Sequence, residues 1–252
     1  MRGLRRLLDA SKGSSFRVTV LVVDMALLIW LISSSPAHAD AFRFVFPGIW
    51  ETLRLALTSF PLALILGLLA ALSVISNNYI LNSIANFYIR VVRGIPTLVV
   101  LLYVGVVAVP LLSNLLGIGK LSGFTRAVIA LALASGPYHA EVIRGGFRAI
   151  DKGQFEAARS IGMRYFQSLR FVILPQVFRI TLPSVANEFI IMLKDTALAS
   201  ALGVIELTRS GQLNVSRTRD TFSTWNVVTL LYLLLTVSLS FGTEMIRRKI
   251  GD

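Results

Sequence analysis

The sequence predicts an all-α integral membrane protein with five core helices that follow one N-terminal hydrophobic helix. Apolar residues make up 55% of the 252 residues and charged residues only 15%, too few to cover a soluble domain of this size. The apolar residues also form charge-free runs from Leu55 to Ile89, from Ile95 to Ile118 and from Thr221 to Thr243. Each run reaches the roughly 20 residues that a helix needs to cross a bilayer, and a helix satisfies its own backbone hydrogen bonds in lipid.

The charge and the rare residue types exclude several other classes of function. The net charge of +12 would suggest nucleic-acid binding in a soluble protein, but no basic stripe interleaved with exposed aromatics is present. In a membrane protein the same excess reflects Lys and Arg in cytoplasmic loops. The chain has no cysteine, and its two histidines, His38 and His139, lie far apart in the sequence. We therefore expect no nucleic-acid partner, no metal site, no cofactor and no catalytic residue.

Residues 1–40 are expected to form a basic cytoplasmic N-terminus followed by a hydrophobic helix from about Phe16 to Ser35. This helix is either a retained signal anchor or a cleaved signal peptide, because Ala37 and Ala39 have the small-residue spacing of a signal-peptidase site. Asp24 inside it costs roughly 3 kcal/mol in hydrocarbon unless a partner helix accommodates it. We favour retention, and cleavage stays open as the alternative.

The five core spans follow and alternate in direction across the membrane. They are predicted at Gly48–Ile75, Asn86–Leu112, Phe124–Ile143, Leu182–Ile205 and Asn226–Ile246. The first begins outside and the last ends inside, so both termini lie in the cytoplasm if the N-terminal helix is retained. Most Lys and Arg residues fall in the segments assigned to the cytoplasm, which supports this orientation. The exception is the external loop that carries Arg209, Arg217 and Arg219.

Residues 144–179 form a cytoplasmic loop whose pattern differs from that of a simple connector. Apolar residues recur at helical spacing, Gly162 supplies a helix stop, and the helical period then restarts before Pro175. The apolar positions are Phe155, Ala158, Ile161, Phe166, Leu169 and Val172 or Ile173. The pattern predicts two short amphipathic helices that meet at a glycine bend. Such a pair presents a rigid surface to a soluble partner or, alternatively, lies on lipid headgroups.

This loop resembles the EAA loop of permease subunits of ATP-binding-cassette (ABC) importers. The family pattern is Glu-Ala-Ala, three residues, Gly, nine residues and then Ile-x-Leu-Pro. The matching positions are Glu156, Ala157, Ala158, Gly162, Leu174 and Pro175, with Val172 in the Ile position. In that family the loop docks in a cleft of the ATP-binding subunit. The resemblance therefore implies that these residues couple the chain to an ATPase.

The resemblance covers residues 46–249 and narrows to the polar amino-acid branch, which takes up histidine, glutamine or arginine. The segments that match this branch are Gly48–Leu53, Val92–Thr97, Tyr138–Gly145, Lys152–Gln154 and Leu193–Ser200. The resemblance implies a type I ABC importer transmembrane domain in the bacterial inner membrane. The implied partners are an ATP-binding cassette subunit, a second permease chain (identical or different), an external solute-binding protein, the polar amino-acid substrate and the lipid bilayer.

The expected function is translocation of polar amino acids into the cytoplasm by a non-catalytic subunit, driven by ATP hydrolysis on a separate subunit. The chain has no Gly-x-x-x-x-Gly-Lys-Ser/Thr motif, and the segment that begins at Gly117 has the wrong spacing. The main alternative is a secondary transporter driven by an ion gradient, with Asp24, Glu188 or Asp195 as a relay. A non-transporting membrane scaffold is the second alternative. Neither explains the Glu-Ala-Ala loop.

Polar residues within the spans are candidates for the translocation path, because charges at membrane depth are costly. The candidates are Glu188, Lys194, Asp195 and Tyr138. Lys194 and Asp195 project about 100° apart on a helix, so each lines the path or pairs with another helix. Glu188 faces either the ammonium group of a substrate or the hydrogen-bonded interior of the bundle. Gly136 and Pro137 either free carbonyls toward a cavity or only kink their helix.

Overall fold

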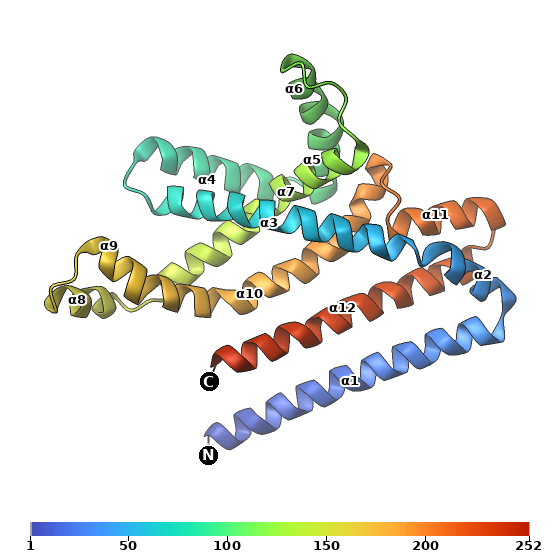
Figure 1. Cartoon of the computed structure of the whole chain (residues 1–252), viewed down its shortest axis with the longest axis horizontal. Coiled ribbons are helices and arrows are strands. Elements are labelled where there is room, and N and C mark those ends of the chain that lie inside the picture. Colours follow the sequence, from blue (N-terminus) through green and yellow to red (C-terminus); the bar gives the residue numbers. More distant parts are fainter. Residues whose placement is uncertain (1, 252) are drawn as a thin grey trace.

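The computed structural model describes the backbone of residues 2–251 and the side-chain surroundings of residues 16–243. Within residues 2–251 the chain is helical and contains no strand, so the prediction of an all-α protein is confirmed (Figure 1). The helices, in chain order, are α1 (Arg2–Ser34), α2 (Pro36–Val45), α3 (Gly48–Ile75), α4 (Tyr79–Gly94), α5 (Thr97–Leu102), η1 (Tyr103–Ala108), α6 (Val109–Leu115), α7 (Gly123–Arg148), α8 (Lys152–Ser160), α9 (Tyr165–Ser168), η2 (Leu169–Ile173), α10 (Leu174–Asp195), η3 (Thr196–Leu202), α11 (Leu207–Thr218) and α12 (Thr221–Gly251).

Within the described residues, five stretches of helix are long and apolar enough to cross a membrane. They are Phe16–Ser34, Pro36–Ile75, Thr97–Leu115, Tyr165–Leu202 and Thr221–Thr243. The span expected near Phe124–Ile143 forms as α7, but α7 is not among these five helices. Its polar residues are accommodated because α7 is the most deeply enclosed helix, with its longest contact along α3. Helices sheltered by protein rather than lipid need not be uniformly apolar.

Helices α1 and α12 lie side by side, and α2 and α11 cover their far ends (Figure 1). Leu28 of α1 is buried with Leu231 of α12 and Val45 of α2 in one apolar cluster. Ser35 has an extended backbone and Pro36 begins the next helix, which turns the chain at this point. The start of α1 and the end of α12 therefore lie at the same end of the molecule as α8 and α9 (Figure 1).

The span predicted at Asn86–Leu112 is wrong, because the helix is broken between α4 and α5. Helix α4 ends at Gly94, and Ile95 takes an extended backbone with φ −108° and ψ 138°. A residue before proline disfavours the helical region, so Pro96 forces this break. Helix α4 folds back along α3, and the membrane-length helix begins only at Thr97.

The span predicted at Leu182–Ile205 begins earlier than expected and ends as a tighter helix. Backbone hydrogen bonding is continuous from α9 through η2 into α10, so the membrane-length stretch starts at Tyr165. It ends at Leu202 in a 3-10 segment, and Gly203 then closes it with φ +82°. A left-handed glycine is a common helix terminator because it has no Cβ to clash.

Candidate functional site

Helix α8 ends in a hydrogen-bonded turn centred on Gly162. The N–H of Gly162 donates to the carbonyl of Arg159 at 2.9 Å, and the N–H of Met163 donates to that of Ala158 at 3.1 Å. These two bonds form a Schellman motif, which requires a left-handed residue at the position of Gly162. Gly162 has φ +83°, and open space surrounds the site where a Cβ would stand. The predicted glycine stop is therefore needed for backbone conformation and not for packing.

The start of α8 is equally well defined, because the carboxylate of Asp151 accepts a hydrogen bond from the N–H of Gly153 at 2.6 Å. Glu156 and Ala157 on this helix are exposed and available to a partner. Ala158 differs from the expectation, since it is only 3% exposed and lies on the side of α8 that packs toward η2. Its small side chain permits close packing inside the loop.

Two contacts fix α8 against the helix that follows the turn. The rings of Phe155 and Tyr165 stack with centroids 5.9 Å apart and planes 15° apart. The amide of Gln176 donates to the side-chain oxygen of Gln154 at 3.2 Å, which ties α10 to α8. The coupling knob, defined as residues 151–168, is therefore a braced unit joined directly to α10.

The second of the two predicted amphipathic helices is not short, because α9 continues through η2 into α10. The N–H of Leu174 donates to the carbonyl of Leu169, five residues back, which makes η2 a π-helix. This wider turn lets the helix pass into Pro175, which has no N–H to give and would otherwise clash with the preceding turn. Leu174 and Pro175 are both exposed at the start of α10. The helix that leaves the coupling knob is thus continuous with the membrane-length helix.

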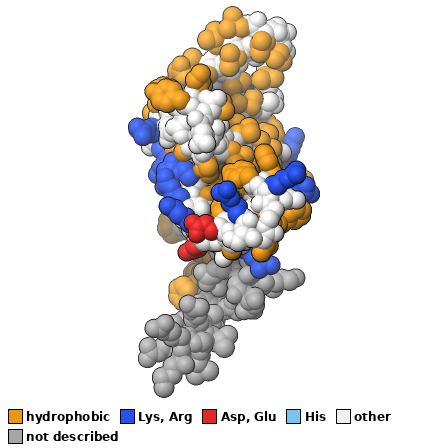
Figure 2. Space-filling model, turned by 90° about the vertical axis from the view of Figure 1, so that its left-hand side faces the viewer, with side chains coloured by type: hydrophobic (Ala, Val, Ile, Leu, Met, Phe, Trp, Pro, Cys, Tyr) orange, Lys and Arg blue, Asp and Glu red, His pale blue; other side chains and the backbone are white. Residues whose placement is uncertain are grey.

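The end of the molecule that carries α8 and α9 is strongly basic. Figure 2 views this end and shows many Lys and Arg side chains but few Asp and Glu. On α7, the carboxylate of Glu141 pairs with Arg144 at 3.3 Å and with Arg93 at 3.9 Å. An excess of cations is typical of the cytoplasmic side of membrane proteins.

A proline in the centre of α7 leaves one backbone carbonyl free, and a neighbouring helix satisfies it. Pro137 cannot donate to the carbonyl of Leu133, which instead accepts the hydroxyl of Tyr88 at 2.8 Å. A Cβ at Gly136 would collide with this hydroxyl. Helix α7 is unbroken at Gly136 and Pro137, so the suggested interruption is not formed. No local sequence pattern points to Tyr88, because its partner lies 45 residues away.

The structure does not bring the four substrate-path candidates together into one site. Glu188 and Asp195 are half-buried on α10 and lie seven residues apart, so they fall on the same side of the helix. Lys194 is exposed and faces another direction. Tyr138 lies on α7, where the Arg93 guanidinium stands 5.7 Å from its ring centroid. Within residues 16–243, neither Glu188, Lys194 nor Asp195 forms a salt bridge.

Glu206 organises the end of the molecule opposite the coupling knob, although no sequence motif singles it out. Its carboxylate accepts the N–H groups of Thr208 at 2.8 Å and Arg209 at 2.7 Å, and the hydroxyl of Tyr232 at 2.8 Å. The residue is fully buried, and this burial raises the pKa of Glu206 while the hydrogen bonds from Thr208, Arg209 and Tyr232 oppose the rise. The N–H of Leu207 donates to Thr52 at 3.1 Å. This network caps α11 and joins it to α3 and α12.

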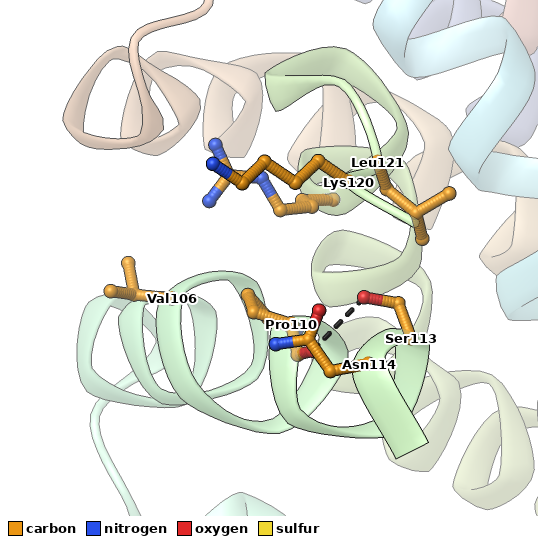
Figure 3. A pocket seen from close by; sticks show the side chains of 7 residues that line it. Val106, Pro110, Ser113, Asn114, Lys120 and Leu121 are labelled. Carbon is orange, nitrogen blue, oxygen red and sulfur yellow. Dashed lines mark hydrogen bonds between the residues drawn. The ribbon is translucent and has the colours of Figure 1, made fainter. Parts of the chain in front are cut away.

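A cavity of about 300 Å³ opens between α6 and the start of α7, also far from the coupling knob. Figure 3 shows Lys120 on one side of it, opposite Ser113 and Asn114. Arg126 also lines it and donates to the carbonyl of Gly105 in η1 at 3.2 Å. Its described lining contains no carboxylate. The cavity therefore offers hydrogen-bond donors without a fixed counter-charge.

Comparison with known proteins identifies the family to which the chain belongs. Residues 63–252 match the model of the binding-protein-dependent transport system inner membrane component family, a region that includes the coupling knob and α10. The chain belongs to this family. It is a permease subunit of an ABC transporter, which confirms the family resemblance and the function expected from the loop. An ion-driven transporter and a scaffold, the two alternatives, leave the loop unexplained.

The permease is similar to several curated relatives over most of its length. It is 34% identical over 209 residues to the glutamine transport system permease protein of Escherichia coli, covering 83% of this chain and 94% of that protein. A probable amino-acid permease protein of Bacillus subtilis is 35% identical over 212 residues, which cover 83% of this chain and 92% of that protein. The octopine transport system permease protein of Rhizobium meliloti is 37% identical over 196 residues, which cover 73% of this chain and 81% of that protein.

Solved structures support the fold of the permease. The crystal structure of an amino acid ABC transporter with histidines aligns with a TM-score of 0.75 and 34% identity, covering 84% of this chain and 96% of that one. The inward-facing methionine transporter MetNI aligns with a TM-score of 0.69 at 21% identity, which bears on the fold alone. The predicted type I ABC importer transmembrane domain is thereby confirmed, and the permease is a multi-pass inner membrane protein.

Proposed function

We propose that the permease moves a polar amino acid into the cytoplasm as one half of a permease dimer, powered by ATP hydrolysis on a separate subunit. The relatives named for glutamine, octopine and amino-acid transport support this substrate class. An external solute-binding protein delivers the amino acid. The permease itself performs no chemistry, and ATP-driven closure of its partner rocks the spans between inward-facing and outward-facing states.

The observation that carries the proposal is the exposed, braced coupling knob on a continuous helix. Glu156 and Ala157 stand on its outer surface, while the stack of Phe155 on Tyr165 keeps α8 in place. The ATP-binding subunit docks on this surface. Because α9, η2 and α10 form one rod, displacement of the knob shifts the half-buried acids Glu188 and Asp195 on α10.

The basic end in Figure 2 faces the cytoplasm in this proposal, together with both termini. Retention of helix α1 is supported by Leu28, which is only 8% exposed and lies in one apolar cluster with residues of α2 and α12. The substrate passes along the α10 face that carries Glu188 and Asp195, with Lys194 and Tyr138 as further candidates for contact.

Co-purification with the ATP-binding subunit tests the proposal. Ala157→Trp adds bulk to the exposed face of α8 without touching its packing, and we expect it to abolish the association. Ala201→Trp makes the same change at an exposed alanine far from the coupling knob and serves as the matched control. Equal recovery of the ATP-binding subunit with both variants would show that the knob is not its docking surface.

A further inference from the structure

Two adjoining cavities form one groove along the membrane-spanning helices beside the coupling knob. Their volumes are about 400 Å³ and about 640 Å³, within the range of small-molecule sites. Leu68 of α3, Phe147 of α7 and Leu174 of α10 line both cavities, so the two adjoin at these side chains. The groove therefore runs from the interior of the bundle to its basic end.

The inner part of the groove is apolar. Its lining residues are Leu64, Leu68, Ile143, Phe147, Leu174, Val177, Phe178, Thr181, Leu182 and Val185. Thr181 is the one hydroxyl in this set, and it donates to the carbonyl of Val177 in its own helix at 2.9 Å. This part has no hydrogen bond to offer a polar ligand, so it suits a hydrocarbon chain.

The mouth of the groove has the opposite character. Arg144 and Arg148 line it together with Phe155 and Tyr165 of the coupling knob. Arg148 is exposed and has no salt bridge within residues 16–243. Arg144 shares Glu141 with Arg93, and its Nε atom is buried without a hydrogen-bond partner in the described part of the chain. No carboxylate appears among the described lining residues, so the mouth attracts an anion.

We propose that this groove binds a phospholipid of the cytoplasmic leaflet, with its phosphate on Arg148 and Arg144 and an acyl chain against α3, α7 and α10. The cationic mouth matches the phosphate of such a molecule, and the apolar inner part matches its acyl chain. The lipid contacts Phe155 and Tyr165 as well as Leu68, so it joins the coupling knob to α3. Binding of the lipid does not depend on the proposed function. An effect of the lipid on ATP-driven transport would depend on it.

Labelling of the detergent-purified permease with a photoactivatable phosphatidylglycerol, without ATP or other subunits, tests the site. Each arginine near an anionic lipid contributes about 1 kcal/mol, so Arg148→Gln should weaken labelling about fivefold and Arg144→Gln with Arg148→Gln further. Arg90→Gln removes an exposed arginine of α4 outside the groove and should leave labelling unchanged. Photoactivatable phosphatidylcholine, with the same chains, should label the wild type less than phosphatidylglycerol does.

A second variant tests the acyl end without altering the charges. Val185→Trp fills the inner cavity and should displace the label from Phe178 and Leu182 in peptide mapping, while gel filtration reports that the protein stays folded. Labelling that is equal in the wild type, Arg148→Gln and Val185→Trp would overturn the proposal. A photoreactive amino acid placed at Phe178 provides the converse test. Its crosslinking to a second permease chain instead of lipid would overturn the proposal too, because the groove would then be a subunit contact.

Discussion

The hydroxyl of Tyr88 on α4 donates to the carbonyl of Leu133 on α7 at a distance of 2.8 Å. Pro137 leaves that carbonyl without its helical partner, so the short helix α4 completes the hydrogen bonding of α7. An unpaired carbonyl inside the bundle would cost about 1–3 kcal/mol. Helix α4 therefore has a structural role even though it falls outside the five membrane-length stretches.

Tyr88→Phe should destabilise the permease by about 1–3 kcal/mol, because it leaves the carbonyl of Leu133 unsatisfied. Pro137→Ala in the same chain restores an N–H donor, so the double variant should lose less than the sum of the two single variants. Thermal unfolding in detergent measures all four proteins. Strict additivity of the two changes would mean that the hydroxyl of Tyr88 and Pro137 act independently.

Glu206→Gln should destabilise the permease by about 1–3 kcal/mol. The amide has one acceptor oxygen where the carboxylate uses two, so it faces an N–H donor of Thr208 or Arg209 with its own NH₂ group. Glu156→Gln, at an exposed position of α8, is the control and should leave the melting temperature unchanged. A melting curve for Glu206→Gln that matches the wild type would show that the carboxylate is not needed to cap α11.

Gly162→Ala should weaken binding of the ATP-binding subunit about fivefold, because a left-handed alanine costs about 1 kcal/mol. Gly162→Asn should be milder, since asparagine tolerates this conformation better. Gly94→Ala is the matched control, because it also has open space for a Cβ but has no positive φ. Titration of the permease with the purified ATP-binding subunit measures the three affinities. If Gly94→Ala is as harmful as Gly162→Ala, the turn geometry is not the cause.

Glu188→Gln should lower uptake of arginine about tenfold and affect glutamine less, since the half-buried carboxylate would attract a cationic substrate most strongly. The comparison uses reconstituted complexes supplied with arginine, glutamine or glutamate at equal concentrations. Glu51→Gln, which removes a surface ion pair with Arg54, serves as the control. Unchanged uptake of all three amino acids would remove Glu188 from substrate recognition.

The class of protein and the helix–turn–helix pattern of the coupling knob could be predicted from the sequence, because both depend on short-range patterns. The stop at Gly162 follows from its left-handed backbone, which glycine favours. Hydrophobic runs were less informative about helix boundaries, since the span predicted at Asn86–Leu112 crosses Pro96 although the helix does not. Likewise, the π turns before Pro175 depend on backbone geometry that residue spacing does not reveal.

Long-range contacts could not be predicted from the sequence alone. The partner of Tyr88 lies 45 residues away, and Leu207 donates to Thr52 across 155 residues. The burial of Glu206 depends in the same way on α12, whose Tyr232 donates to its carboxylate. Arg148 and Leu68 meet in one groove only once α3 and α7 pack together.

ATP-driven uptake in proteoliposomes tests the central claim most directly. Purified permease with its ATP-binding subunit should accumulate radiolabelled amino acid delivered by the solute-binding protein, and Ala157→Trp should stop accumulation while Ala201→Trp permits it. Permease alone should accumulate none, with or without an imposed ion gradient. Full uptake by the permease without any ATP-binding subunit would contradict the conclusion that the coupling knob delivers the energy for transport.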